Sequence, residues 1–156
     1  MIIVDVEASG LHQESYPIEI AWQDSEQPES FDSFLIVPLA HWCHWDDYAE
    51  NEIHHISREL LFDSGITVNE ACERLNSALI NQVIYSDAVD YDQRWIMRIF
   101  DETEIKPTFN FGSVIDLLPK GGDFKYNQLL ENAPIKHRAL DDARQIAAWV
   151  HHILET

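Results

Sequence analysis

Two carboxylates stand close together after the first apolar run of the chain. Residues 1–4 are apolar and mostly β-branched, which is typical of a buried strand. Asp5 and Glu7 follow at i and i+2, and because strand side chains alternate, both point to the same face. Two like charges beside a core repel each other and lose hydration. A divalent cation relieves both costs, so the pair predicts a metal site.

Two further acids occupy the first turns of predicted helices. Asp92 precedes Ile96 by four residues, and Asp142 precedes Ile146 by four, so each acid lies at the N-terminal end of a core-facing stripe. Taken alone, each acid is explained by its favourable interaction with the helix dipole. Asp141 falls away from the stripe, which makes Asp142 the better candidate for a site.

His137 lies five residues before Asp142. Five helical positions turn through roughly 140°, so the two side chains face one site only if His137 belongs to the loop before the helix. A loop histidine beside a metal cluster suits a general base. A histidine without such neighbours is more often a solvated loop residue.

The order of these residues resembles the DEDDh 3′–5′ exonucleases, the DnaQ-like and RNase T-like members of the RNase H-like superfamily. Three motifs carry the resemblance, at residues 5–11 (DVEASGL), 85–92 (YSDAVDYD) and 137–143 (HRALDDA). Residues 16–20 are similar to the family's second strand, and residues 53–57 to its Ile-His-Gly-Ile-Thr segment. The resemblance covers nearly the whole chain.

The sequence departs from the family pattern at four positions. Ser9 stands where Thr is usual, and His55 where Gly is usual. Asp87 stands where His is often found, and Ala88 where Asn is usual. The changes at Asp87 and Ala88 would alter substrate contacts near the site, whereas Asp92 is kept.

The resemblance implies that two divalent cations are held by the four acids, Asp5, Glu7, Asp92 and Asp142. Carboxylate oxygens and an anionic substrate favour Mg²⁺ or Mn²⁺, with the ions roughly 3.5–4 Å apart. Asp5 would bridge both ions. His137 would deprotonate a water positioned by one ion for in-line attack on the terminal phosphodiester, while the other ion steadies the departing 3′ oxygen.

The turn after the first strand is the expected substrate contact. By the resemblance, the 3′-terminal nucleotide would be touched by the catalytic histidine and the turn, that is by Ala8, Ser9, Gly10, Leu11 and His137. A glycine here lets the backbone approach a ligand closely. Leu11 is interpreted equally well as a wedge against the terminal base and as an apolar staple that closes the turn.

The net charge of −18 restricts the substrate. Ten Lys and Arg face twenty-eight Asp and Glu, whereas proteins that grip long nucleic acid usually carry a basic face. The sequence therefore favours single-stranded or short nucleic acid. RNA is our first choice of substrate, although the charge does not decide between RNA and DNA. A DNA exonuclease of the proofreading type, and a non-catalytic binding module on the same fold, are the alternatives.

The predicted elements indicate an α/β fold, an RNase H-like mixed β-sheet with three antiparallel leading strands plus parallel strands, flanked by helices. Strands are expected at residues 1–7, 18–23, 31–37, 83–85 and 114–117. Helices are expected near residues 47–54 and 57–62, from residue 67, from about residue 91, and at residues 125–130 and 140–154. We expect one exonuclease domain over residues 1–156.

The remaining sequence features concern where the protein works. No apolar run is long enough to span a membrane, and strand-like sequence from Met1 argues against a signal peptide. Cys43 and Cys72 fit free thiols in a reducing cytosol, although one disulfide stays open. We expect a cytoplasmic protein without a membrane partner. Many members of the family form homodimers, so the resemblance makes a homodimer plausible for this chain.

Overall fold

The protein is described here from a computed structural model, which covers residues 1–134 and 137–156. Its centre is a mixed sheet with the strand order β3-β2-β1-β4-β5 among the described residues. The strands are β1 (Ile2–Ala8), β2 (Pro17–Asp24), β3 (Phe31–Leu35), β4 (Val83–Ser86) and β5 (Asn110–Ser113). The first three pair antiparallel, whereas β4 pairs parallel with both β1 and β5. The predicted α/β fold with a mixed sheet is confirmed.

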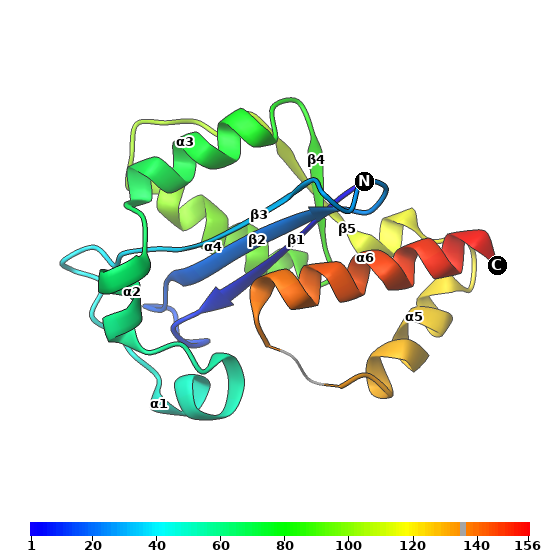
Figure 1. Ribbon diagram of the computed structural model, residues 1–156, viewed down its shortest axis with the longest axis horizontal. Helices are drawn as coiled ribbons and strands as arrows, with labels where there is room; N and C mark the ends of the chain where they lie inside the picture. Colours follow the sequence, from blue (N-terminus) through cyan, green and yellow to red (C-terminus); the bar gives the residue numbers. More distant parts are fainter. Residues whose placement is uncertain (135–136) are drawn as a thin grey trace.

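Helices cover both faces of this sheet (Figure 1). They are α1 (Asp47–Ala49), the π-helix η1 (Glu50–His54), α2 (Arg58–Ser64), α3 (Val68–Ala78), α4 (Val89–Asp101), the 3₁₀ helix η2 (Val114–Leu117), α5 (Gly122–Glu131) and α6 (Ala139–Glu155). Thr67 caps α3, because its Oγ1 accepts a hydrogen bond from the Glu70 N–H at 3.1 Å. None of the described helices is long and apolar enough to cross a membrane.

The alternation of side chains along β1 decides which layer each residue joins. Ile2, Val4 and Val6 pack into the core beneath α3 and α4, whereas Ile3 packs against α6 on the opposite face. Asp5 and Glu7 have the parity of Ile3, so both carboxylates point to the α6 side. Figure 1 shows the end of β1 close to the first turn of α6.

The predicted strand at residues 114–117 is wrong, and the fifth strand is Asn110–Ser113 instead. β-branched residues misled the prediction, because Ser113 Oγ accepts a hydrogen bond from the Ile115 N–H at 3.4 Å and starts a 3₁₀ turn there. Gly112 lies in this strand, where a Cβ would come within 2.7 Å of Tyr85 Cε1. The glycine permits close approach rather than a turn.

Cys43 is exposed and Cys72 is buried, and both are free thiols.

Candidate active site

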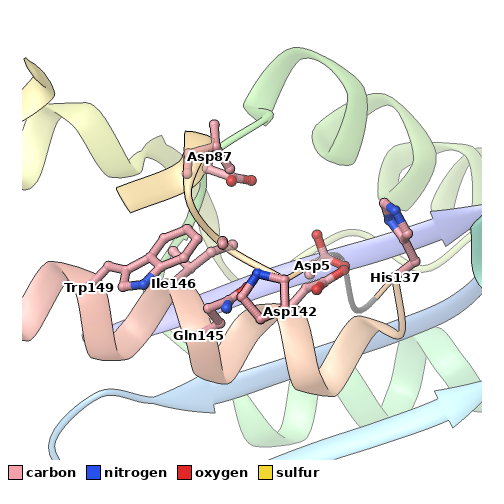
Figure 2. A pocket seen from close by; sticks show the side chains of 10 residues that line it. Asp5, Asp87, His137, Asp142, Gln145, Ile146 and Trp149 are labelled. Carbon is pink, nitrogen blue, oxygen red and sulfur yellow. The ribbon is translucent and has the colours of Figure 1, made fainter. Parts of the chain in front are cut away.

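Three of the predicted acids meet where β1 ends and α6 begins. Asp5 and Glu7 project from β1, and Asp142 lies in the first turn of α6. One carboxylate oxygen from each residue lies within 4.8 Å of the other two. Glu7 is only 8% exposed, and Asp5 Oδ2 is buried without a hydrogen-bond partner. Figure 2 shows Asp5 and Asp142 side by side.

Asp92 reaches the same region from α4, on the other side of β1. It is 4% exposed, and its Oδ2 accepts a hydrogen bond from Ser86 Oγ at 2.6 Å. Ser86 in turn accepts from the Ala88 N–H at 2.9 Å, which ties the end of β4 to the start of α4. Asp92 stands outside the tight group of three, but it lines one cavity together with Asp5 and Glu7.

His137 lies outside α6, on the segment that leads into the helix. This is the position that allows it to face the same site as Asp142. Its φ of 53° is a left-handed conformation that is uncommon for a residue with a side chain. The residue lines a cavity with Asp5 and Asp142 (Figure 2). The loop position resolves the angular problem posed by the spacing of five residues, because both side chains reach the same cavity.

The crowding of carboxylates changes their proton affinity. Burial, together with the charges of Asp142 and Glu19, raises the pKa of Glu7 to about 9. Burial raises the pKa of Asp92 to about 7, against the Ser86 hydrogen bond, which lowers it. Burial and four neighbouring carboxylates raise the pKa of Asp5 well above its usual range. The site therefore favours positive charge, whether as protons or as a metal ion.

The residues of the site fit a divalent cation. In the part of the chain that the structure describes, Asp5, Glu7 and Asp142 form no ion pair with an Arg or Lys side chain. An unpartnered buried carboxylate oxygen is costly unless a cation or proton satisfies it. Oxygen-only ligands favour hard cations such as Mg²⁺ and Mn²⁺. The donor set thus suits the predicted metals.

The turn of residues 8–11 closes over the end of β1. Ser9 is buried, and its Oγ accepts a hydrogen bond from the Tyr16 N–H at 3.2 Å, so this hydroxyl holds the loop together. A Cβ at Gly10 would come within 2.9 Å of Asp46 Cβ, which explains the need for glycine. Leu11 is 73% exposed at the edge of the turn, where it is free to contact a ligand.

Two cavities meet at Asp5. One, of about 180 Å³, opens between α5 and α6 (Figure 2). It is lined by Asp5, Asp87, Leu130, Ala133, Pro134, His137, Asp142, Gln145, Ile146 and Trp149. The other, of about 340 Å³, opens between the turn, α1, η1 and α4. Its lining is largely apolar and comprises Asp5, Val6, Glu7, Ala8, Gly10, Leu11, Asp46, Tyr48, Ala49, Ile53, His54, Ala88, Tyr91, Asp92 and Trp95.

No protein-family model matches the chain, and no curated protein matches it in sequence. Solved structures do match in fold. Escherichia coli exonuclease I in complex with a dA16 oligonucleotide aligns with a TM-score of 0.73 at 16% identity, over 94% of this chain and 39% of that one. Exonuclease X in complex with 5′ overhanging duplex DNA aligns with a TM-score of 0.65 at 17% identity, over 99% of this chain and 90% of that one. The chain therefore has the fold of these exonuclease structures.

A zinc-bound E. coli exonuclease I complex with single-stranded DNA also matches, with a TM-score of 0.72 at 16% identity over 94% of this chain. This chain spans 38–39% of the exonuclease I chains, which is less than half of their length. The expectation of one exonuclease domain over residues 1–156 stays a prediction. Of the four acids predicted from the motifs, Asp5, Glu7 and Asp142 lie together at the end of β1, and Asp92 lines a cavity with Asp5 and Glu7.

Two more polar residues line these cavities: Asp87, which was expected near the site from the sequence, and His54, for which the sequence had indicated no role in the site. Asp87 lines the cavity between α5 and α6 and accepts a hydrogen bond from Tyr126 Oη at 3.1 Å. His54 is 2% exposed and lines the larger cavity; its Nδ1 accepts from the Ile56 N–H at 3.0 Å. Burial lowers the pKa of His54 to about 4, which makes it neutral at pH 7. Its position in the segment 53–57 was the available signal.

Replacing Ser86 with Ala is expected to lower metal-dependent activity roughly tenfold, in the range of losses when a group that orients a metal ligand is removed. The substitution leaves Asp92 in place but removes the 2.6 Å hydrogen bond that orients its carboxylate. Steady-state kinetics over a Mn²⁺ series would measure the loss. Ser113→Ala is the matched control, because Ser113 is the register partner of Ser86 on β5 and its hydroxyl caps η2. Equal activity of Ser86→Ala and wild type at every Mn²⁺ concentration would contradict this role.

Proposed function

We propose that this chain is a metal-dependent 3′–5′ exonuclease that hydrolyses phosphodiester bonds at the 3′ end of single-stranded or short nucleic acid. The observation that carries the proposal is the convergence of Asp5, Glu7 and Asp142, whose oxygens lie within 4.8 Å of one another. This convergence occurs on the exonuclease fold, at the junction of two cavities, with His137 alongside. The fold alone does not establish an activity.

Asp5, Glu7 and Asp142, joined by Asp92, would hold the cations. Bound Mg²⁺ or Mn²⁺ would supply neutralisation of the charge that develops on the phosphoryl oxygens. The cluster's own negative charge otherwise repels a phosphodiester, so the carboxylates act on substrate only when compensated. Ser86 contributes by fixing the orientation of Asp92.

His137 is the proposed general base. It lines the cavity with Asp5 and Asp142, from a loop position that leaves its ring accessible to a water and a substrate phosphate. An imidazole nitrogen within reach of an attacking water can accept its proton in the transition state. Asp142 lies close enough for its charge to interact with the histidine, and this negative charge would favour the imidazolium that forms.

The larger cavity is the proposed site of the terminal nucleotide. Its apolar lining suits a base, and exposed Leu11, Tyr48 and Tyr91 stand at its border. Aromatic side chains stack on bases without regard to sequence. With a net charge of −18, the protein lacks the basic face that a long duplex needs, which supports single-stranded or short substrates.

RNA is the substrate that we propose first, and DNA is the second candidate. The solved exonuclease I and exonuclease X structures hold DNA, which is the observation that favours the second. The proposed exoribonuclease activity therefore stays a prediction until both sugars are compared on matched sequences.

The experiment is a time course on 5′-labelled RNA, DNA and hybrid oligonucleotides of one sequence, with Mn²⁺ or with EDTA. The proposal predicts a ladder that shortens one nucleotide at a time from the 3′ end, in Mn²⁺ only. Faster shortening of RNA than of DNA would support an exoribonuclease, and the reverse would support the DNA reading. Mn²⁺ bound at the carboxylates without turnover of any substrate would favour a non-catalytic module and overturn the proposal.

A further inference from the structure

A second buried glutamate lies directly beside the acid cluster. Glu19 on β2 is the register partner of Glu7 on β1, and residues directly opposite each other in an antiparallel pair share a face. Both side chains are buried, at 4% exposure for Glu19 and 8% for Glu7. The two glutamates are chemically equivalent, yet their partners differ completely.

Glu19 is held by the start of α6. Arg138 Nε donates to Glu19 Oε1 at 3.0 Å, and Arg138 Nη2 donates to Oε2 at 2.6 Å, which makes a two-pronged guanidinium–carboxylate pair. The Ala139 N–H also donates to Glu19 Oε1, at 2.9 Å. These hydrogen bonds link β2 to the start of α6, across sequence separations of 119 and 120 residues.

The contact with Ala139 replaces a local helix cap. The side chain of Arg138, the N-cap residue, makes no capping hydrogen bond, so the first free N–H of α6 depends on Glu19. His137 immediately precedes the pair, and Asp142 lies one turn beyond it. A carboxylate at this point also interacts favourably with the positive end of the helix dipole.

We propose that Glu19 and Arg138 are positioning residues of the active site. The pair anchors the first turn of α6 to β2, which sets Asp142 and His137 against Asp5 and Glu7. This inference rests on the proposed function, since it concerns the same acids.

The pair also determines which glutamate is available for a cation. Arg138 neutralises Glu19 and occupies both of its oxygens, whereas Glu7 forms no ion pair with any described Arg or Lys. Without Arg138, two adjacent buried carboxylates would both be uncompensated, which is strongly unfavourable. The guanidinium thus leaves one glutamate for the metal and removes its neighbour from competition.

The test compares Glu19→Gln, Glu19→Ala, Arg138→Lys and Arg138→Ala with wild type. Glu19→Gln keeps an oxygen for the Ala139 N–H but loses the charge, and Arg138→Lys keeps the charge but loses the planar fork. The matched control is Arg74→Ala, because Arg74 pairs with Asp32 in the same two-pronged manner, at 2.6 and 2.5 Å, between α3 and β3. Three readouts are needed: kcat and KM separately, Mn²⁺ affinity by calorimetry without substrate, and Tm.

We expect both alanine variants to lower kcat and weaken Mn²⁺ binding, each by roughly 10–100-fold, as when groups that orient metal ligands are removed. KM should change little, and the two conservative variants should recover part of the loss. Any effect of Arg74→Ala should be confined to a lower Tm, and kcat and Mn²⁺ affinity should be unchanged. If the alanine variants do not fold, Glu19→Gln and Arg138→Lys carry the test through the same readouts.

Variants of Glu19 and Arg138 that change Tm alone, as the control does, would overturn the proposal. The Mn²⁺ arm separates this inference from the proposed function. Wild type that binds Mn²⁺ without cutting any substrate would refute the nuclease, while weaker Mn²⁺ binding by the variants would still support positioning. If wild type is a nuclease but substitutions of Glu19 and Arg138 leave kcat and Mn²⁺ affinity unchanged, the proposed function stands and the positioning role is refuted.

Discussion

Asp142→Asn is expected to abolish 3′-end trimming, with a loss in kcat/KM of roughly 10³-fold or more, which corresponds to about 4 kcal/mol of transition-state stabilisation. The substitution keeps the shape and polarity of the side chain but removes its charge. Asp142 supplies one of three oxygens that lie within 4.8 Å of one another, so the cation site loses a ligand. Its neighbour His137 also loses the adjacent negative charge that would favour the protonated imidazole.

Asp141→Asn provides the matched control. Asp141 is the adjacent acid in the same helical turn, but it is exposed and lies outside the acid cluster. Removing its charge alters the net charge and the helix dipole interaction in the same way, without touching the site. The measurement is the rate of shortening of a labelled oligonucleotide in Mn²⁺. Similar losses in both variants, or full activity of Asp142→Asn, would contradict the assigned role of Asp142.

How far the sequence predicts the site is clearest at α6. Periodicity alone placed Asp142 on the core-facing side and Asp141 away from it, and the structure agrees because helix geometry fixes both from local spacing. His137 needed more than periodicity, since only a loop conformation lets it share a cavity with Asp142. The motif resemblance provided that context.

Glu19 and His54 show what local patterns leave out. The pairing of Glu19 with Arg138 crosses 119 positions, and no periodicity encodes a contact at that separation. His54 becomes buried through a π-helix and the left-handed residue after it, which are departures from the regular repeat. The strand predicted at residues 114–117 was wrong for a related reason, because the hydrogen bond from the Ile115 N–H to Ser113 Oγ outweighs the strand propensity of the β-branched residues there.

The second large effect concerns stability. We expect Glu7→Gln to raise the stability of the metal-free protein at pH 8 by about 1–3 kcal/mol, because one pKa unit corresponds to 1.36 kcal/mol. In a domain of this size, each kcal/mol moves Tm by roughly 2–4 °C. The reason is that Glu7 is buried among Asp5, Asp142 and Glu19, so its charged form is unfavourable. A neutral amide of the same shape removes the repulsion.

The same shifts set the direction of the pH dependence. The pKa of Glu7 is raised from 4.5 to about 9 in the folded protein, so between these values the folded state holds a proton that the unfolded state has released. Stability of the metal-free protein therefore rises as pH falls from 9. His54 acts oppositely, since burial lowers its pKa from 6.5 to about 4 and protonation favours unfolding in that window. The stability of the metal-free protein is therefore expected to rise most as the pH falls from 9 to about 6.5.

A divalent cation should weaken this pH dependence in wild type, whereas the Glu7→Gln variant lacks the titrating glutamate from the start. At one hundred times its Kd, a cation that binds only the folded state adds about 2.7 kcal/mol. Because it compensates the same carboxylates as the protons do, Mn²⁺ should raise the Tm of wild type most at pH 8 and least at pH 6. Glu7→Gln should have the higher Tm without metal and gain less from Mn²⁺, because one ligand of the cluster is missing.

Thermal melts of both proteins at pH 6 and pH 8, with Mn²⁺ or EDTA, measure the Tm change on metal binding for each protein at each pH. A wild type whose Tm ignores Mn²⁺ at pH 8 would show that the carboxylates are not a cation site.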